Sequence, residues 1–313
     1  MNTRKVGLYL AFSFGISWAI AAVLYLLSQG EPNQIVMMVA SSLFMWGPAL
    51  AVLIVQKGFY KESLAPYGWT FKRLNGIWLL LSLAVPLVIF LLYLGTVALL
   101  GNGLGLPGMG TVDLSREGLI AQIELLAAQA GQPANTGGLT SLPLPGWLLL
   151  LVMMLAAVIP GASLNAFFAF GEELGWRGLM QEETRSLGFW RSNLLIGIVW
   201  GIWHSPLLLM GHNYGDSGWL GIPVMAAFCV GMSFVMGYLA QRTGSIIGPS
   251  MLHGVVNAVA GFSILYVHGS DPLIGGVAGL AGAVPALLLT LGLLRDKSRL
   301  AAWAGASNQI YGS

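Results

Sequence analysis

Charged side chains are scarce in this chain of 313 residues, and their scarcity excludes most soluble architectures. Only 8% of the residues are Asp, Glu, Lys or Arg, whereas 56% are hydrophobic. A soluble domain usually carries about 25% charged residues, because its surface faces water. So few charges cannot cover a water-facing surface of this size, and lipid must solvate most of the chain. The composition therefore predicts an integral membrane protein.

Cysteine and strong net charge are also lacking. The single cysteine, Cys229, excludes an intramolecular disulfide and a cysteine-rich metal cluster. Because it lies in an apolar run, we expect a packed, unreactive thiol. The net charge is only +2, and no basic patch is interleaved with aromatic residues, so nucleic acid is not an expected partner.

Long apolar runs are what the chain does have. A membrane helix needs about 20 mostly apolar residues, and about eight segments meet this requirement. We see no internal repeat and no soluble domain. The predicted fold is an all-α polytopic membrane protein, in which residues 1–313 form a single transmembrane domain with a bundle of about eight helices. The predicted spans are Val6–Ser28, Ile35–Gln56, Gly76–Leu100, Gly146–Phe170, Asn193–Met210, Trp219–Ala240, Ser245–Val267 and Pro272–Leu294.

Basic residues occur in every second predicted loop. They precede the first span, follow the second, fourth and sixth spans, and follow the eighth, whereas the other loops have almost none. Basic loops usually face the cytoplasm. We therefore expect a cell-membrane protein with both termini cytoplasmic. The residues that carry this pattern are Arg4, Lys5, Lys57, Lys61, Lys72, Arg73, Arg177, Arg185, Arg191, Arg242, Arg295, Lys297 and Arg299.

One non-cytoplasmic loop, 101–145, is much longer than the others. Asp113 is a candidate cap for a short helix. Leu119, Ile120, Ile123 and Leu126 then fall on one helix face. We expect an amphipathic segment that lies on the membrane surface, with a lid that recognises substrate as the alternative.

A pair of glutamates marks the cytoplasmic end of the fourth predicted span. Ionisable residues in membrane spans are costly and usually functional. Adjacent residues on a helix point about 100° apart, so Glu172 and Glu173 cannot face one site equally. Glu173 and Arg177 have the spacing of an ion pair along a helix, which leaves Glu172 as the free carboxylate. An acidic cap with a salt bridge is the structural alternative.

Two further polar motifs lie within apolar spans. His204 lies about 15 Å from the start of the fifth span, and Pro206 follows it. His253 and Asn257 share one face of the seventh span. Taken singly, each is explained by hydrogen bonds within or between membrane helices. Together with a carboxylate, they supply a base for water, a proton carrier and an oxyanion donor, which peptide hydrolysis needs.

The ordered motifs resemble the CPBP family, which comprises the type II CAAX prenyl endopeptidases and bacterial bacteriocin-processing and immunity-type proteins. Glu-Glu-x-x-x-Arg, aromatic-x-x-x-His and His-x-x-x-Asn follow one another on successive spans, within a core at 172–257. The aromatic residue here is Trp200, where the family usually has Phe. The resemblance implies an intramembrane endopeptidase that hydrolyses a peptide bond at the cytoplasmic side of the membrane or within it. Its substrate would be a membrane-associated peptide or protein.

The resemblance also implies a role for each residue. Glu172 and His204 would activate water. His253 and Asn257 would stabilise the oxyanion. Glu173 and Arg177 would support these residues. No cofactor is expected, and no His-Glu-x-x-His run is present. Glu172, His204 and His253 would nevertheless suffice as ligands for a catalytic zinc ion, which is the alternative.

Other classes of protein give a different account of the same residues. A proton-coupled transporter would also use intramembrane Glu and His, but its inverted repeats are not seen in this sequence. A non-catalytic immunity factor or chaperone would carry the motifs as vestiges. The remaining polar groups, His212, His268 and the Glu-Glu-Thr-Arg cluster at 182–185, are expected to be solvated.

Overall fold

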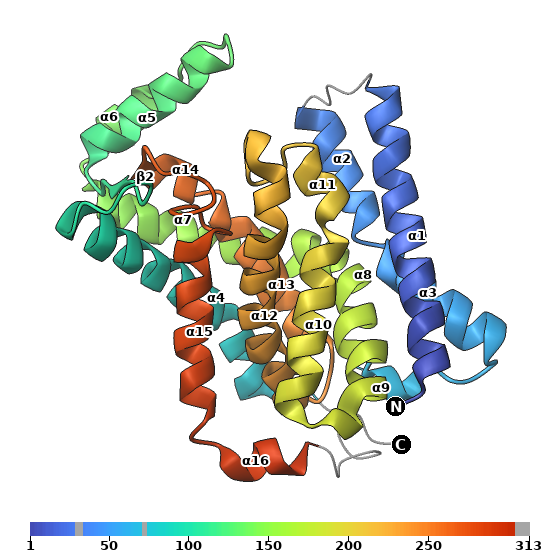
Figure 1. Ribbon diagram of the computed structural model, residues 1–313. Coiled ribbons are helices and arrows are strands. Elements are labelled where there is room, and N and C mark those ends of the chain that lie inside the picture. The colour runs from blue at the N-terminus through green and yellow to red at the C-terminus, as the bar shows by residue number, and fades with distance from the viewer. Residues whose placement is uncertain (29–33, 71–73, 304–313) are drawn as a thin grey trace.

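The structure, a computed structural model, describes residues 1–28, 34–70 and 74–303, which are mostly helical (Figure 1). Two short strands, β1 (Thr111–Val112) and β2 (Val267–His268), pair antiparallel. The all-α polytopic membrane fold predicted from the composition is confirmed.

Six helical stretches of the described residues are long and apolar enough to cross a membrane. They are Thr3–Leu27, Ile35–Phe59, Gly76–Gly103, Gly146–Leu187, Gly215–Thr243 and Ile247–Tyr266. The other two predicted spans form shorter helices. The fifth is α10 (Phe189–Trp203), followed by α11 (Ser205–Leu209), and the eighth is α15 (Leu280–Leu293). The predicted count of eight is therefore approximate.

Most of the long stretches consist of several elements in direct succession. The first is α1 (Thr3–Leu27). The second contains α2 (Gln34–Phe44), α3 (Gly47–Leu53) and η1 (Ile54–Phe59), and the third contains α4 (Gly76–Val97) and η3 (Ala98–Gly103). The fourth contains α7 (Gly146–Pro160), η4 (Gly161–Asn165), α8 (Ala166–Glu173), η5 (Leu174–Met180), α9 (Gln181–Thr184) and η6 (Arg185–Leu187). The last two contain η7 (Gly215–Ser217), α12 (Gly218–Thr243), α13 (Ile247–Ala260) and α14 (Ser263–Tyr266), and the short helices elsewhere are η2 (Ala65–Tyr67), α5 (Arg116–Gln129), α6 (Gly137–Ser141) and α16 (Lys297–Ala302).

The fourth stretch contains two π-helical turns, η4 and η5. The first follows Pro160, where Gly161 packs so closely on α13 that a Cβ would lie 2.8 Å from Val255 Cα. The second begins directly after Glu173, and π turns within α-helices are frequent at functional sites. The helix continues through α9 to Leu187, so the predicted end of this helix at Phe170 is wrong. Glu172 lies within the helix and is buried.

Close packing of α10 on α12 holds the middle of the bundle together. Gly197 and Gly201 of α10 face the backbone of α12, and a methyl group on either glycine would overlap Val230 or Ala226. Small residues at such contacts are typical of membrane helices, because they let two backbones approach. α13 packs against α4, α8 and η4, and α15 packs against α12 and α4.

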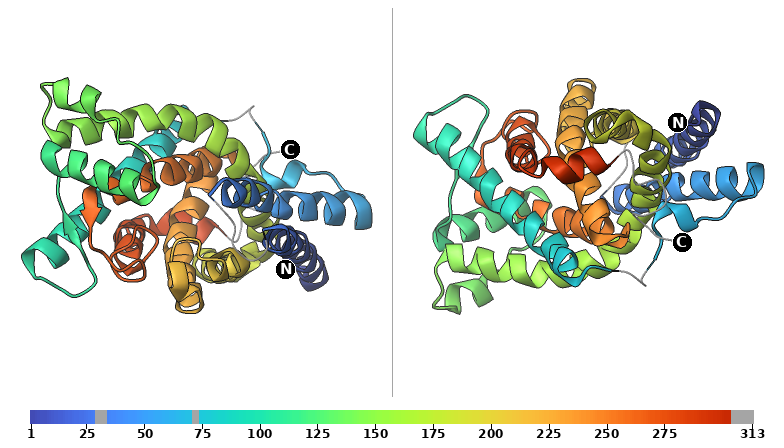
Figure 2. Two further views of the ribbon diagram at one scale, coloured as in Figure 1. Left: turned by 90° about the horizontal axis from the view of Figure 1, so that it is seen from above. Right: turned by 90° about the horizontal axis from the view of Figure 1, so that it is seen from below.

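The two ends of the bundle differ in charge. The start of α1, together with α9 and α16, lies at one end, and α5, α6 and α14 lie at the other (Figures 1 and 2). The first end, called the basic end below, carries Arg4, Arg185, Arg191, Arg242 and Lys297. The opposite end is called the far end.

The long loop at the far end is partly helical. Ser115, not Asp113, caps α5, because its hydroxyl accepts from Gly118 N at 2.9 Å. Asp113 instead accepts from Ser115 N at 2.8 Å, and hydrogen bonds with Ser115 lower the pKa of the Asp113 carboxyl. The predicted apolar face is confirmed only in part: Leu119 is buried, but Ile123 and Leu126 are half-buried. Its placement on the membrane surface stays a prediction.

A group of charged residues at the basic end is more buried than the sequence predicts. Lys5 of α1 is buried, and its ammonium lies 2.8 Å from Glu62 and 3.2 Å from Glu183. Arg185 is also buried and pairs with Glu182. The expectation of a solvated cluster at 182–185 is therefore wrong, because the start of α1 lies against it.

Candidate active site

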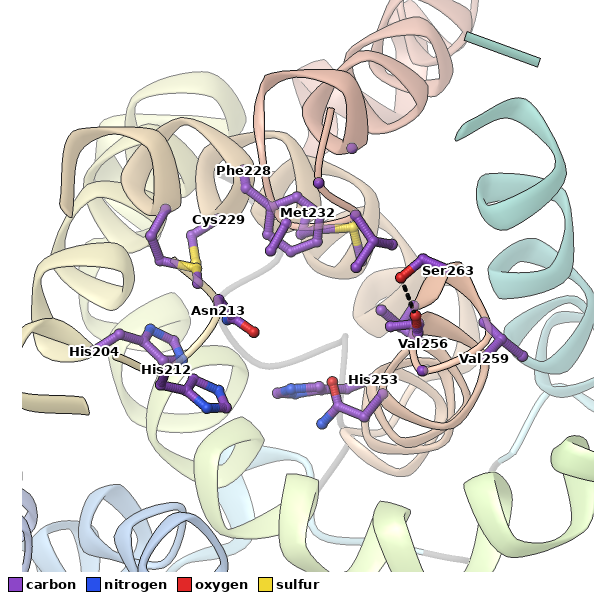
Figure 3. Close-up of a pocket in the computed structure, with 18 of the residues that line it drawn as sticks. His204, His212, Asn213, Phe228, Cys229, Met232, His253, Val256, Val259 and Ser263 are labelled. Atoms are coloured by element: carbon purple, nitrogen blue, oxygen red, sulfur yellow. Dashed lines mark hydrogen bonds between the residues drawn. The ribbon is translucent and has the colours of Figure 1, made fainter. Parts of the chain in front are cut away.

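A cavity of about 670 Å³ lies among α4, α8, α10, α12 and α13. The four residues predicted to carry the chemistry, Glu172, His204, His253 and Asn257, all line it, and so does Trp200. Figure 3 shows His204 and His253 pointing toward one another in this cavity, and the centroids of their rings lie 6.0 Å and 5.4 Å from that of Trp200. The structure thus brings together three motifs that are separated along the chain.

Trp200 holds the carboxylate of Glu172 in place. The indole N–H donates to Glu172 Oε2 at 2.5 Å, and Glu172 as a whole is only 2% exposed. Sequence reasoning gave Trp200 no polar role. The only signal of its polar role is the presence of Trp where related proteins usually have Phe, because Phe has no donor.

Glu173 does not line the cavity but contacts His253, which does. His253 Nδ1 lies 2.9 Å from Glu173 Oε1, and Arg177 Nη1 lies 3.1 Å from Glu173 Oε2. The predicted ion pair is confirmed, and Glu173 and Arg177 are fully buried. The Arg177 guanidinium also stacks on the Trp200 ring at 4.5 Å, a cation–π contact. Since a carboxylate accepts, Nδ1 of His253 carries a proton and Nε2 is left for other partners.

His204 lies at the turn that joins α10 to α11. Its Nδ1 lies 2.8 Å from the carbonyl oxygen of Trp200. A carbonyl can only accept, so Nδ1 carries the proton, and Nε2 of the neutral ring is an acceptor. Pro206 has no N–H for the carbonyl of Ile202, which accepts instead from the Ser205 hydroxyl at 2.5 Å. The proline therefore sets the turn that presents His204.

His212 is a further histidine of the cavity. It is half-buried, lines the cavity, and lies beside His204 in Figure 3. Its backbone N–H donates to the Leu207 carbonyl at 3.0 Å, which folds the turn back over the cavity. Burial lowers the pKa of the His212 imidazole, so the neutral form is favoured. The prediction of a solvated loop histidine is therefore wrong. The turn that places His212 at the cavity depends on tertiary packing, which the local sequence does not indicate.

His268 also differs from the prediction. It is half-buried, and its backbone belongs to β2, opposite Thr111 of β1. Its Nε2 lies 3.3 Å from the Leu265 carbonyl oxygen. This histidine contributes to the far end of the fold rather than to the cavity.

The wall contributed by α12 is apolar. Cys229 is a buried free thiol in this wall, as predicted. The other lining residues of α12 are Met225, Phe228, Met232 and Met236. The cavity therefore combines polar groups from α8, α10 and α13 with an apolar surface suited to an apolar chain segment.

A metal ion finds no prepared ligand set in this arrangement. Across 1–28, 34–70 and 74–303, no three His, Cys, Asp or Glu side chains are placed to hold a metal ion. The zinc alternative named Glu172, His204 and His253, and these three do not form such a group among the described residues.

The fold and the site define a multi-pass helical membrane protein with a buried glutamate and histidine cluster at a cavity. Residues 143–259 match the family model described as type II CAAX prenyl endopeptidase Rce1-like. That range extends from just before α7 into α13. It contains all the residues assigned to the site above: Glu172, Glu173, Arg177, Trp200, His204, His212, Cys229, His253 and Asn257.

A curated relative agrees with this match. The protein named CAAX prenyl protease 2 of Methanococcus maripaludis is 27% identical to this chain over 106 residues. The aligned part is 32% of this chain and 39% of the relative. The resemblance to the CPBP family predicted from the ordered motifs is thus confirmed over this core.

Proposed function

We propose that this protein is an intramembrane endopeptidase that uses a glutamate-activated water and no metal ion. The observation that carries the proposal is the placement of Glu172, His204, His253 and Asn257 around one cavity. The matched family and relative support the class of activity. The substrate is a membrane-associated peptide or protein, of which an apolar segment would lie along the wall of α12.

The first step is attack of water on the peptide carbonyl. Glu172 takes one proton from the water, and the hydroxide that results adds to the carbonyl carbon, whose oxygen becomes an oxyanion. His204 presents Nε2 to the same water, because its Nδ1 is occupied by the Trp200 carbonyl. The proton held by Glu172 then passes to the leaving amine as the carbon–nitrogen bond breaks. A positioned base of this kind contributes about 10²–10⁴-fold to the rate.

The oxyanion also needs hydrogen-bond donors. Asn257 supplies an amide N–H, and His253 supplies Nε2 when both of its nitrogens carry protons. Glu173 favours that state, since its carboxylate accepts from Nδ1 at 2.9 Å. Glu173 and Arg177 are positioning residues: they are buried behind the histidine and do not line the cavity.

Orientation in the membrane is part of the proposal. The basic end carries Lys and Arg from successive loops, so we place it and both termini in the cytoplasm, in the cell membrane. Reporter fusions after residue 75 and after residue 299 should both report a cytoplasmic location. A signal from the opposite side at either site would contradict this orientation.

The test of the activity is peptide cleavage by the purified protein. Wild type should cleave members of a peptide library with apolar segments, and Glu172→Gln should lose about 10²–10⁴-fold while it folds normally. Glu117→Gln on α5 is the matched control, because its side chain is 78% exposed and lies outside the cavity. Full activity of Glu172→Gln would overturn the assignment. Metal analysis of active protein, and inhibition by a chelator, would reveal a zinc mechanism instead.

A further inference from the structure

The cavity occupies only one half of the bundle. α12 runs from the far end to the basic end, and its lining residues stop at Met236. A helix rises about 1.5 Å per residue, so Met236 lies about 10 Å from the end of α12 at Thr243. α10 runs in the opposite direction, and it lines the cavity only from Trp200 onward, about 16 Å from its start at Phe189.

Two more helices show the same asymmetry. α4 and α13 both begin toward the basic end (Figure 1). α4 lines the cavity from Pro86 to Tyr93, in its second half, and α13 lines it from His253 to Ala260. Other lining residues belong to far-end loops: His212, Asn213, Gly261, Ser270 and Pro272.

The basic half of the bundle is closed by packed side chains. A layer of polar residues from η5, α9 and α10 is 0% exposed: Arg177, Gln181, Thr184, Ser192 and Asn193. Thr184 and Ser192 are hydrogen-bonded through their hydroxyl groups at 2.6 Å. A peptide could not pass this layer unless the helices separated.

From these positions we infer that the substrate reaches Glu172 from the far end, which is the extracytoplasmic face when the basic end lies in the cytoplasm. That the substrate is a peptide rests on the proposed peptidase function. The direction from which it enters rests on the position of the cavity. The substrate is then an apolar peptide segment exposed on, or anchored in, the extracytoplasmic side of the membrane. This differs from the cytoplasmic-side cleavage that the family resemblance implies.

The far-end loops that line the cavity, called its mouth below, carry polar groups that can hydrogen-bond to a peptide backbone. The described residues provide no hydrogen-bond partner for the imidazole of His212 or the amide of Asn213, and Asn213 is exposed. Asn213 adopts a left-handed backbone conformation with φ of 64°, which Asn tolerates better than most residues. The mouth loops 211–217 and 261–282 contain no Lys or Arg, in keeping with an extracytoplasmic location.

Cysteine labelling tests the direction of access. In a Cys229→Ala background, single cysteines replace Asn213 at the mouth and Arg191 at the basic end, and sealed vesicles of either orientation receive a membrane-impermeant maleimide. Asn213→Cys should react in right-side-out vesicles, and Arg191→Cys only in inside-out vesicles. Asp216→Cys, also exposed in the mouth loop, is the second probe if Asn213→Cys folds poorly.

Labelling should also block the cavity. Modified Asn213→Cys should lose at least about tenfold of its peptide cleavage, whereas modified Arg191→Cys should keep its activity. Labelling of both mouth cysteines only in inside-out vesicles, or from neither side, would overturn the inference. Labelling needs no activity, so a protein that shows the expected labelling but cleaves no peptide would contradict the proposed function alone.

Discussion

The two halves of the bundle use polar side chains in opposite ways. Toward the basic end, charged groups are packed against one another, as Lys5 is between Glu62 and Glu183. Toward the far end, polar groups face a cavity instead, as Glu172 and His204 do. The comparison indicates that burial alone does not mark a functional residue in a membrane protein. What distinguishes the site is that its polar atoms are fixed on one side and open to a cavity on the other.

The largest effect on stability is expected from removing the buried ion pair between Glu173 and Arg177 in the closed half. Arg177→Ala leaves the Glu173 carboxylate buried without its ion pair, which costs about 3–5 kcal/mol. The melting temperature or the yield of folded protein should fall accordingly. Arg242→Ala is the control, because its pair with Asp296 is partly exposed and should contribute no more than about 1 kcal/mol. A fully stable but inactive Arg177→Ala would mean that the arginine contacts substrate.

The open half is tested by removing an oxyanion donor. Asn257→Ala should lower kcat by about 10²–10³-fold with little change in stability, because Asn257 is exposed to the cavity. His253→Ala should lower kcat by a similar factor if it serves the same oxyanion. Both variants are measured by peptide cleavage and by thermal unfolding. Unchanged kcat in Asn257→Ala would remove this residue from the mechanism.

A smaller effect is expected at the boundary between the halves. Trp200→Phe keeps the ring beneath Arg177 but deletes the donor to Glu172, so we expect about tenfold lower kcat/KM and near-normal stability. Trp203→Phe is the matched control, since its indole also packs against His204 but contacts no carboxylate through a hydrogen bond in the described chain. Equal activity of wild type and Trp200→Phe would show that the indole acts through packing alone.

The smallest effect concerns a charge at the rim of the closed half. The hydrogen bond from Lys5 lowers the pKa of the Glu62 carboxyl, so the folded state holds its proton less tightly than the unfolded state. This stabilisation is present above the unfolded pKa of about 4.3 and is lost as the pH falls through the lower folded value. Glu62 is half-exposed, so Glu62→Gln should lower the melting temperature slightly at pH 7. The difference from wild type should vanish near pH 3, and a difference that grows with acid would contradict the assignment.

The sequence predicted those features that depend on composition or on short spacing. Scarce charge and long apolar runs indicate a helical membrane protein, and the i,i+4 spacing of Glu173 and Arg177 indicates their ion pair. The order of the three motifs indicates which residues meet. These patterns are local, so they can be interpreted without knowing how the helices pack.

Features that depend on tertiary packing were missed. Glu173 and His253 are hydrogen-bonded although they are 80 positions apart, and no spacing rule covers such a distance. His212 was expected in solvent because it lies in or next to a short loop, but the turn folds back onto the cavity. Glu183 pairs with Lys5 of α1, a contact that the local sequence around 182–185 does not describe.

The glycines between α10 and α12 have a consequence for the range of substrates. Gly197 and Gly201 fix how near the two helices come, and Trp200 and His204 lie on the same helix as these glycines. A bulkier residue at either glycine would push α10 away and carry the carboxylate's donor and the histidine outward with it. The width of the cavity thus depends on Gly197 and Gly201, which do not line it. A relative with a larger side chain at this contact should therefore accept a thicker chain segment, even with every lining residue unchanged.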